Sequence, residues 1–358
     1  MFDFCLPGAL VERALTGFAA GLLFALPALS QPASIPSAIP AAVSAESSAI
    51  DRSAEAWLLR MHQASRKSTY MGTFVVSSGA HMSSSRIWHV CEGDQKIERI
   101  EALSGAPRSI FRRNDQVVTF SAHDKVVRFE RREELGVFPN LLKANDSSIA
   151  SFYVARQTGV DRVAGFDADV VQLMPKDPLR YGYRVWTERK TGMAVKLQTL
   201  DGHGHVLEQA AFSDLQFNVP VTLSKLEQMM GNTDGYRVEK PELVKTTASD
   251  EGWTMAHAVA GFKSMSSYKR PIASDGDVGA RTDSRLQWIF SDGLASVSVF
   301  VEAYDRMHHR REGTWSMGAT QTLTRRLVAP GGDWWLTVMG EVPHRTLLIF
   351  AQGLERKK

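Results

Sequence analysis

The segment Arg180-Tyr-Gly-Tyr-Arg-Val-Trp-Thr-Glu-Arg-Lys-Thr-Gly192 runs on to Leu200-Asp-Gly-His-Gly-His-Val-Leu-Glu-Gln209. Gly192 and Gly202 divide it, and between them the side chains alternate in type, with Val195, Leu197 and Thr199 on one parity. Alternation with a period of two between glycine turns is typical of an antiparallel meander with one face exposed to solvent. The segment therefore predicts sheet structure, and it contains no pattern of catalytic residues.

The same pattern extends towards the N-terminus. Short apolar or alternating runs, separated by Gly, Asn and Asp turns, predict strands over 73–76, 86–90, 96–100, 109–111, 117–120 and 126–129. One helix, starting at Asp51 or Ser53, precedes them. A sheet with so few helices tends to curl into a barrel or half-barrel, which packs its lumen or binds something apolar there. The candidate lumen residues are Phe74, Val76, Phe120 and Phe129.

The C-terminal part has a different pattern. Ser291-Asp292-Gly293 and Gly331-Gly332 each separate two apolar runs and predict hairpins. After Pro343, apolar residues recur with helical spacing, at Leu347, Phe350, Ala351 and Leu354. We expect this helix to lie on a four-stranded sheet, so the second domain is predicted to be α+β.

The N-terminal sequence is typical of a targeting segment. Arg13 precedes an apolar run that ends at Ala28-Leu29-Ser30, a small-x-small pattern that favours cleavage before Gln31. The alternative is an uncleaved anchor, although the run is shorter than the roughly 20 residues of a membrane span. The predicted organisation is a signal peptide (1–30), a flexible leader (31–50), a half-barrel domain (51–219), a linker (220–240) and a C-terminal domain (241–358).

Bulk composition limits the function classes. A chain of 358 residues favours two domains, and 44% hydrophobic with 23% charged residues is ordinary for a globular protein. The net charge of +3 does not indicate nucleic-acid binding, which needs a concentrated basic face. Cys91 is the one cysteine after the signal peptide, so we expect no internal disulfide. It reads as a buried apolar residue, with a redox thiol as the alternative.

The sequence shows no catalytic or cofactor motif. It contains no HExxH, GxSxG, Walker loop or CxxC pair. His203 and His205 lie two apart in a turn, but two ligands do not make a zinc site, so we expect solvated histidines. No cofactor and no metal are predicted.

A basic loop and a group of tryptophans are candidates for binding a partner. Arg306-Met-His-His-Arg-Arg311 offers guanidinium donors to an acidic partner, although a solvated turn is the simpler interpretation. Trp334 and Trp335 should point to opposite faces of a strand, which leaves one of them available to an interface. The candidate partner-binding residues are Arg306, His308, His309, Arg310, Arg311 and Trp334.

Several segments together resemble one known family. Asp177-Pro-Leu-Arg-Tyr-Gly-Tyr-Arg-Val-Trp186, Val206-Leu-Glu-Gln209, Gly72-Thr-Phe-Val75, Ser291-Asp-Gly-Leu-Ala-Ser-Val-Ser-Val-Phe-Val-Glu302 and Gly340-Glu-Val-Pro343 are similar to the MucB/RseB family of periplasmic sigma-E regulators. The similarity spans roughly residues 53–355 in the family's order, and no single short motif carries it.

The resemblance implies a fold and a role. It implies a large antiparallel half-barrel, similar to lipoprotein carriers, followed by a smaller α+β domain. It also implies a periplasmic protein that binds the periplasmic domain of an RseA/MucA-type anti-sigma factor and shields it from the site-1 protease. Lipid or lipopolysaccharide would trigger release. The family points mainly to the C-terminal domain for the anti-sigma contact.

Three functional hypotheses follow. The first is the regulatory binding protein that the resemblance implies, and the second is a periplasmic carrier of lipids or lipoproteins. The third, a hydrolase, lacks a nucleophile constellation. A homo-oligomer is compatible with the first two.

Overall fold

The computed structural model describes residues 57–131, 138–139, 149–241, 243–271, 284–309, 311–329 and 331–357. The predicted signal peptide and leader lie outside these ranges. All described residues belong to one compact unit, Ala49–Lys358.

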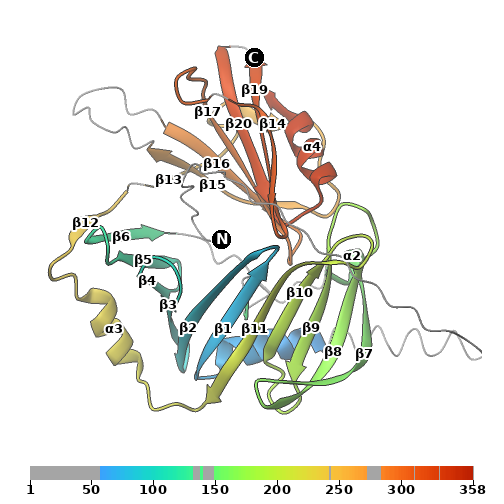
Figure 1. Ribbon diagram of the computed structural model, residues 1–358. Coiled ribbons are helices and arrows are strands. Elements are labelled where there is room, and N and C mark those ends of the chain that lie inside the picture. The colour runs from blue at the N-terminus through green and yellow to red at the C-terminus, as the bar shows by residue number, and fades with distance from the viewer. Residues whose placement is uncertain are drawn as a thin grey trace, which may run out of the picture. The chain divides into compact units, whose positions relative to one another are not determined.

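The larger sheet is a meander, as the alternation predicts (Figure 1). In the described residues its twelve strands follow the order β12-β6-β5-β4-β3-β2-β1-β11-β10-β9-β8-β7, so most strands pair with their neighbours in sequence. Of these described strands, only β12 runs parallel to its partner, β6. The strands are β1 (Tyr70–Ser78), β2 (His81–Glu92), β3 (Gln95–Ala102), β4 (Arg108–Arg113), β5 (Gln116–Ser121), β6 (Val126–Arg131), β7 (Tyr153–Val163), β8 (Phe166–Pro175), β9 (Gly182–Glu188), β10 (Ala194–Leu200), β11 (Val206–Phe217) and β12 (Arg237–Glu239).

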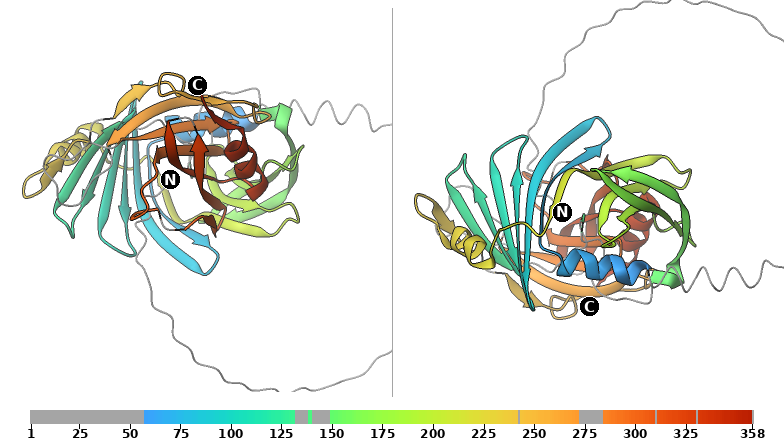
Figure 2. Two further views of the ribbon diagram at one scale, coloured as in Figure 1. Left: turned by 90° about the horizontal axis from the view of Figure 1, so that it is seen from above. Right: turned by 90° about the horizontal axis from the view of Figure 1, so that it is seen from below.

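Strands β7–β11 curl around a core that a helix over residues 57–67 completes (Figure 2). Met61 of this helix is buried in one cluster with Leu173 of β8. The ring of Phe166 on β8 lies 5.6 Å from that of Phe217 on β11, so strands that are not neighbours approach each other. The edges β12 and β7 do not pair, and the sheet therefore stays open. The predicted half-barrel shape is confirmed.

A short helix, α2 (Ile149–Phe152), precedes β7, and a longer one, α3 (Leu223–Gly231), covers the strands at the other end of this sheet. Thr222 caps it, because its Oγ1 accepts a hydrogen bond from the backbone N–H of Lys225 at 3.3 Å. Leu226 and Met230 are buried with apolar residues of β2–β6. Residues 220–240, expected to be a linker, thus contain α3 and β12, and both are attached to the larger sheet.

The smaller sheet carries α4 (His344–Gly353), where Leu347 and Phe350 are fully buried as the helical spacing predicts. The expectation of four strands is wrong, since the described residues form seven in the order β13-β15-β16-β17-β20-β19-β18. Apolar alternation hardly marks β13, β15 and β18, because they are short or rich in serine and threonine. The strands are β13 (Val244–Thr246), β15 (Lys263–Pro271), β16 (Ser284–Ser291), β17 (Ser296–Ala303), β18 (Gly313–Met317), β19 (Thr320–Ala329) and β20 (Gly332–Gly340). A separate pair joins β14 (Trp253–Met255) to β21 (Leu354–Arg356), so Leu354 lies just beyond the helix.

Candidate functional site

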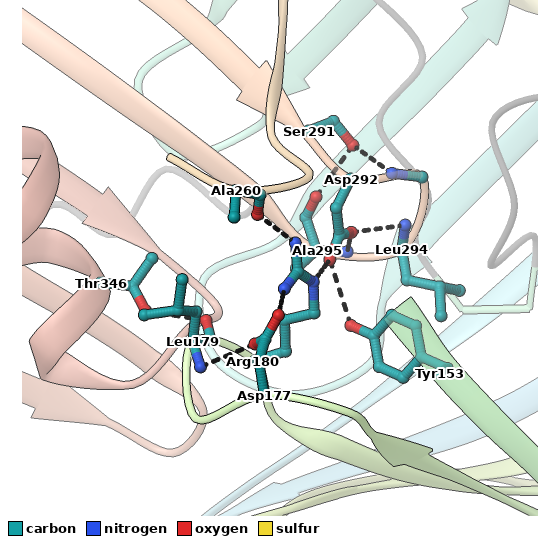
Figure 3. Close-up of polar contacts among 11 residues, drawn as sticks. Tyr153, Asp177, Leu179, Arg180, Ala260, Ser291, Asp292, Leu294, Ala295 and Thr346 are labelled. Carbon is teal, nitrogen blue, oxygen red and sulfur yellow. Dashed lines mark hydrogen bonds and ion pairs between the residues drawn. The ribbon is translucent and has the colours of Figure 1, made fainter. Parts of the chain in front are cut away.

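A buried ion pair joins the two sheets (Figure 3). Arg180 lies in the corner before β9 of the larger sheet, and Asp292 lies in the β16–β17 turn of the smaller one. Arg180 Nε is 2.7 Å from Asp292 Oδ2, and neither side chain is exposed to solvent. A charge without a partner would be very costly there, so each residue requires the other.

Further hydrogen bonds hold each member of the pair. The Arg180 guanidinium also donates to Asp177 Oδ2 and to the carbonyl oxygen of Ala260. Asp292 Oδ1 accepts hydrogen bonds from the backbone N–H groups of Leu294 at 3.0 Å and Ala295 at 2.7 Å. The Asp292 carboxylate therefore stabilises its own hairpin turn and also forms the ion pair with Arg180 of the larger sheet.

Aromatic rings enclose the pair. The Arg180 guanidinium carbon lies 4.3 Å from the ring centroid of Phe152 and 5.1 Å from that of Phe262, within the range of cation–π attraction. The Tyr153 hydroxyl donates to Asp292 Oδ2 at 3.2 Å, and burial raises the pKa of Tyr153 well above its usual value. The phenol therefore stays a neutral donor. Gly261 has a φ of 82°, and a Cβ there would strike the Phe152 ring at 2.7 Å.

A second contact places the β18–β19 turn on the ends of β1 and β11. Ser78 and Glu208 are opposite each other across β1 and β11. Gly318 of the turn has a φ of 56°, and a Cβ there would overlap Ser78 and come within 2.9 Å of Glu208 Oε2. Both the backbone conformation and the space therefore require glycine. The Glu208 carboxylate accepts a hydrogen bond from the backbone of Ala319 in the same turn.

Two carboxyl groups meet near this second contact. Burial raises the pKa of Glu208 to about 7, and the negative charge of Glu341, between β20 and α4, also raises it. Burial raises the pKa of Glu341 too. The pair is therefore a candidate for pH sensitivity.

Further polar contacts lie on either side of these two. Arg270 Nη1 on β15 is 3.4 Å from Glu130 Oε1 on β6. Tyr181 shares a hydrogen bond with Gln321 on β19. Thr346 Oγ1 of α4 donates to the carbonyl oxygen of Leu179 at 2.7 Å. Polar groups on the corner before β9 and at strand ends therefore connect the two sheets.

The basic loop is held by one of its own histidines. His309 Nδ1 accepts the backbone N–H of Asp305 at 2.9 Å, and its ring stacks on Trp335 with centroids 4.9 Å apart. His308 Nδ1 lies 2.6 Å from Asp305 Oδ2. The side chains of Arg306, His308 and Arg311 are exposed, and Arg310 lies outside the described residues. The loop thus presents Arg306 and Arg311 outwards, while His309 anchors it.

Neither Trp334 nor Trp335 is the exposed tryptophan, although one of the two was expected to be. Trp334 lies against Trp253, with centroids 5.3 Å apart, and Arg356 stacks over both rings. Trp335 is 7% exposed. The exposed tryptophan is Trp315 on β18, at 48%. The partner-binding role of Trp334 stays a prediction, although most of this ring serves packing.

The four predicted lumen residues fall into two separate clusters. Phe74 is buried beside Phe212, with Val76 packed against the same cluster under the N-terminal helix. Phe120 is buried under α3, with Phe129 packed against that cluster. They therefore do not line one common site, and their contact with a lipid stays a prediction.

The remaining sequence candidates do not assemble into a reactive centre. Asp201 organises the turn of His203 and His205, and its Oδ1 accepts both backbone N–H groups at 2.8 Å. Cys91 Sγ donates to the carbonyl oxygen of Arg66. Among the described residues, no group of three His, Cys, Asp or Glu could hold a metal, and no helix is long and apolar enough to cross a membrane.

The sequence does not predict that Arg180, Asp292 and Tyr153 form one buried cluster. The alternation around Arg180 predicts only sheet structure, and Ser291-Asp292-Gly293 predicts only a hairpin turn. One signal did exist, because both residues lie in segments that carry the family resemblance. Those two segments, 112 residues apart, meet in the fold.

Comparison with known protein families gives two matches. Residues 53–230 match the model of the MucB/RseB N-terminal domain, and residues 247–355 match that of the MucB/RseB C-terminal domain. A curated relative from Pseudomonas aeruginosa, "Sigma factor AlgU regulatory protein MucB", is 30% identical over 81% of this chain and 87% of its own length. "Sigma-E factor regulatory protein RseB" from Haemophilus influenzae is 29% identical over 86% of this chain and 93% of its own length.

Solved structures extend the similarity to three dimensions. The crystal structure of MucB in complex with MucA(peri) has a TM-score of 0.65 and 26% identity, and it covers 85% of this chain and 99% of that one. The complex structure of Pseudomonas aeruginosa MucA/MucB has a TM-score of 0.66 and 26% identity, with 86% and 99% covered.

The buried ion pair generates a stability prediction. We expect Arg180→Met or Asp292→Asn to lower the free energy of unfolding by about 3 kcal/mol, because each leaves a buried charge without its partner. The double variant should cost clearly less than the sum of the two, by on the order of 1–3 kcal/mol. Urea unfolding measures all three. Arg184→Met is the control, because Arg184 is the partly exposed residue of β9, and it should cost less than about 1 kcal/mol. Additive losses in the double variant would show that the pair is not coupled.

The carboxyl groups generate a pH prediction. The folded chain keeps Glu208 protonated to about pH 7, whereas an unfolded glutamate ionises near pH 4.3. The folded state thus binds more protons between these values, and the free energy of unfolding should fall as pH rises from 5 towards roughly 7. Glu208→Gln should flatten this slope in thermal melts recorded across the range. Glu312→Gln, an exposed control, should retain it, and an unchanged slope in Glu208→Gln would contradict the assignment.

Proposed function

The chain belongs to the MucB/RseB family, and from that premise we propose that it binds the periplasmic domain of an anti-sigma factor of the MucA/RseA type. The observation that carries this proposal is the match to MucB as solved with MucA(peri), which extends over both sheets and covers 99% of that chain. The protein acts in the periplasm as a regulatory binding protein and not as an enzyme. By occupying the anti-sigma factor it keeps the envelope-stress sigma factor inactive.

Protection from the site-1 protease needs no chemistry by the bound protein. The protease cuts only the free anti-sigma domain, so the cleavage rate falls with the fraction that is bound. A signal reverses this only if it binds the free regulator better than the complex. We propose that this signal is a lipid or a lipopolysaccharide fragment.

The larger sheet is the part that suits the lipid. Its buried cluster around Phe74 and Phe212, under the N-terminal helix, is apolar and lies inside the curl of the sheet. Val76 is only partly buried at the side of this cluster. The same features favour the second candidate function, a carrier of lipids or lipoproteins. The two functions are compatible, because a regulator that senses a lipid must also bind it.

The first functional prediction concerns proteolysis. Purified protein in excess should slow cleavage of the anti-sigma periplasmic domain by the site-1 protease, in proportion to the bound fraction, as measured by gel electrophoresis over time. A short peptide that holds only the cleavage site is the control substrate, and its cleavage should not change. Undiminished cleavage of the domain at saturating protein would remove the regulatory proposal and leave the carrier.

The second functional prediction concerns release. Lipopolysaccharide fragments should restore cleavage in the same assay. Val76→Trp should weaken this restoration by at least about fivefold in effective lipid concentration, because the larger indole obstructs the partly buried side of the Phe74 cluster where the lipid is proposed to bind. Phe129→Trp, in the other cluster, is the matched control and should respond like the wild type. Equal responses of all three proteins would place the lipid elsewhere.

A further inference from the structure

Exposed sheet edges are usually protected against pairing with another chain, by short strands, charges or bulges. Among the described residues, three of the four edge strands of the two large sheets follow this rule. Strands β12 and β13 have three residues each, and Arg237 of β12 is paired with Glu239 at 2.6 Å. Strand β7 carries a register irregularity between Gln157 and Gly159. These edges are poor templates for another strand.

Strand β18 is the exception. Its residues Thr314, Trp315, Ser316 and Met317 are exposed, and none of them is charged or proline. Its pairing with β19 runs without a register shift from Gly313 to Met317. The strand is therefore a regular, unprotected edge of the smaller sheet within the described residues.

The turn after β18 determines which backbone groups face outwards. Gly318 has a positive φ and Ala319 does not, as in a type II′ two-residue turn. In such a hairpin the closing pair, Met317 and Thr320, exchanges hydrogen bonds, and bonded pairs alternate along the strands. The N–H and C=O groups of Thr314 and Ser316 then point away from β19. They are the groups that an added strand would use.

The side chains and charges around β18 indicate what kind of strand fits. Trp315 and Met317 share the face opposite Leu323, and they are 48% and 36% exposed. They offer apolar contacts at alternate positions of an incoming strand. The exposed side chains of Arg306 and Arg311 lie in the loop that leads into β18. A complementary segment is therefore extended, apolar at alternate positions and acidic at the end beside this loop.

We propose that an extended segment of the anti-sigma factor adds to β18 as an eighth strand of the smaller sheet. This inference rests on the proposed function and deepens it by naming the surface. Main-chain hydrogen bonds to Thr314 and Ser316 supply affinity, and contacts with Trp315 and Met317 supply specificity. Pairing by a second copy of this chain is the competing occupant.

The test removes one outward N–H without changing the hairpin. Ser316→Pro deletes that donor at a position where an edge strand tolerates proline, and Ser316→Ala changes only the side chain. Affinity for the purified periplasmic domain of the MucA-type partner is measured by isothermal titration calorimetry. We expect Ser316→Pro to weaken binding by at least about tenfold and Ser316→Ala to bind within about twofold of the wild type. Circular dichroism melts establish that both variants fold.

Hydrogen exchange on the wild type gives an independent measurement. The amides of Thr314 and Ser316 should become protected when the partner domain binds, and this result does not depend on how the proline variant folds. Binding of Ser316→Pro at wild-type affinity, or no protection in the complex, would overturn the β18 inference alone. Protection without the partner, in a sample that sediments as a dimer, would assign the edge to a second copy. No binding by the wild type would overturn the proposed function as well.

Discussion

The buried charge of Arg180 is the constraint on which the arrangement of the two sheets depends. A guanidinium cannot lose its proton at any physiological pH, so a buried one must be surrounded by acceptors. The larger sheet supplies only part of this set, through Asp177. Asp292 and the carbonyl oxygen of Ala260 come from the chain beyond β12. The larger sheet therefore cannot satisfy its own corner unless the smaller sheet is in place.

This arrangement of the two sheets shows how a chain whose sequence contains no catalytic motif could still recognise one partner, as the proposed function requires. Its polar residues are used to orient two sheets, and its apolar residues fill the clusters beneath the helices. Two surfaces are then left for binding a partner. One is the open, curved larger sheet, and the other is the regular edge strand β18. Under the proposed function, these surfaces act by binding a partner, and a ligand regulates them by preferring another state of the protein.

Much of the fold was predictable because strand alternation and turn residues are local signals. Gly192, Gly202, Gly293 and Gly331 all lie in turns between neighbouring strands. The strands that were missed, such as β15 and β18, are rich in serine and threonine and carry little apolar alternation. The site was harder, because the partner of Arg180 lies 112 residues away and pairing across such a separation leaves no local pattern. Similarly, nothing in the sequence around Trp315 reveals that its strand is an edge.

The contacts between the sheets have a mechanical consequence. Arg270 contacts Glu130 on β6, Gly318 packs on the ends of β1 and β11, and Asp292 binds Arg180 in the corner before β9. Tyr181 and Leu179, in the same corner, add hydrogen bonds to Gln321 and Thr346. The attachment of the smaller sheet is therefore distributed over several strands. A ligand that displaced any one of these contacts would have to act against the contacts that remain.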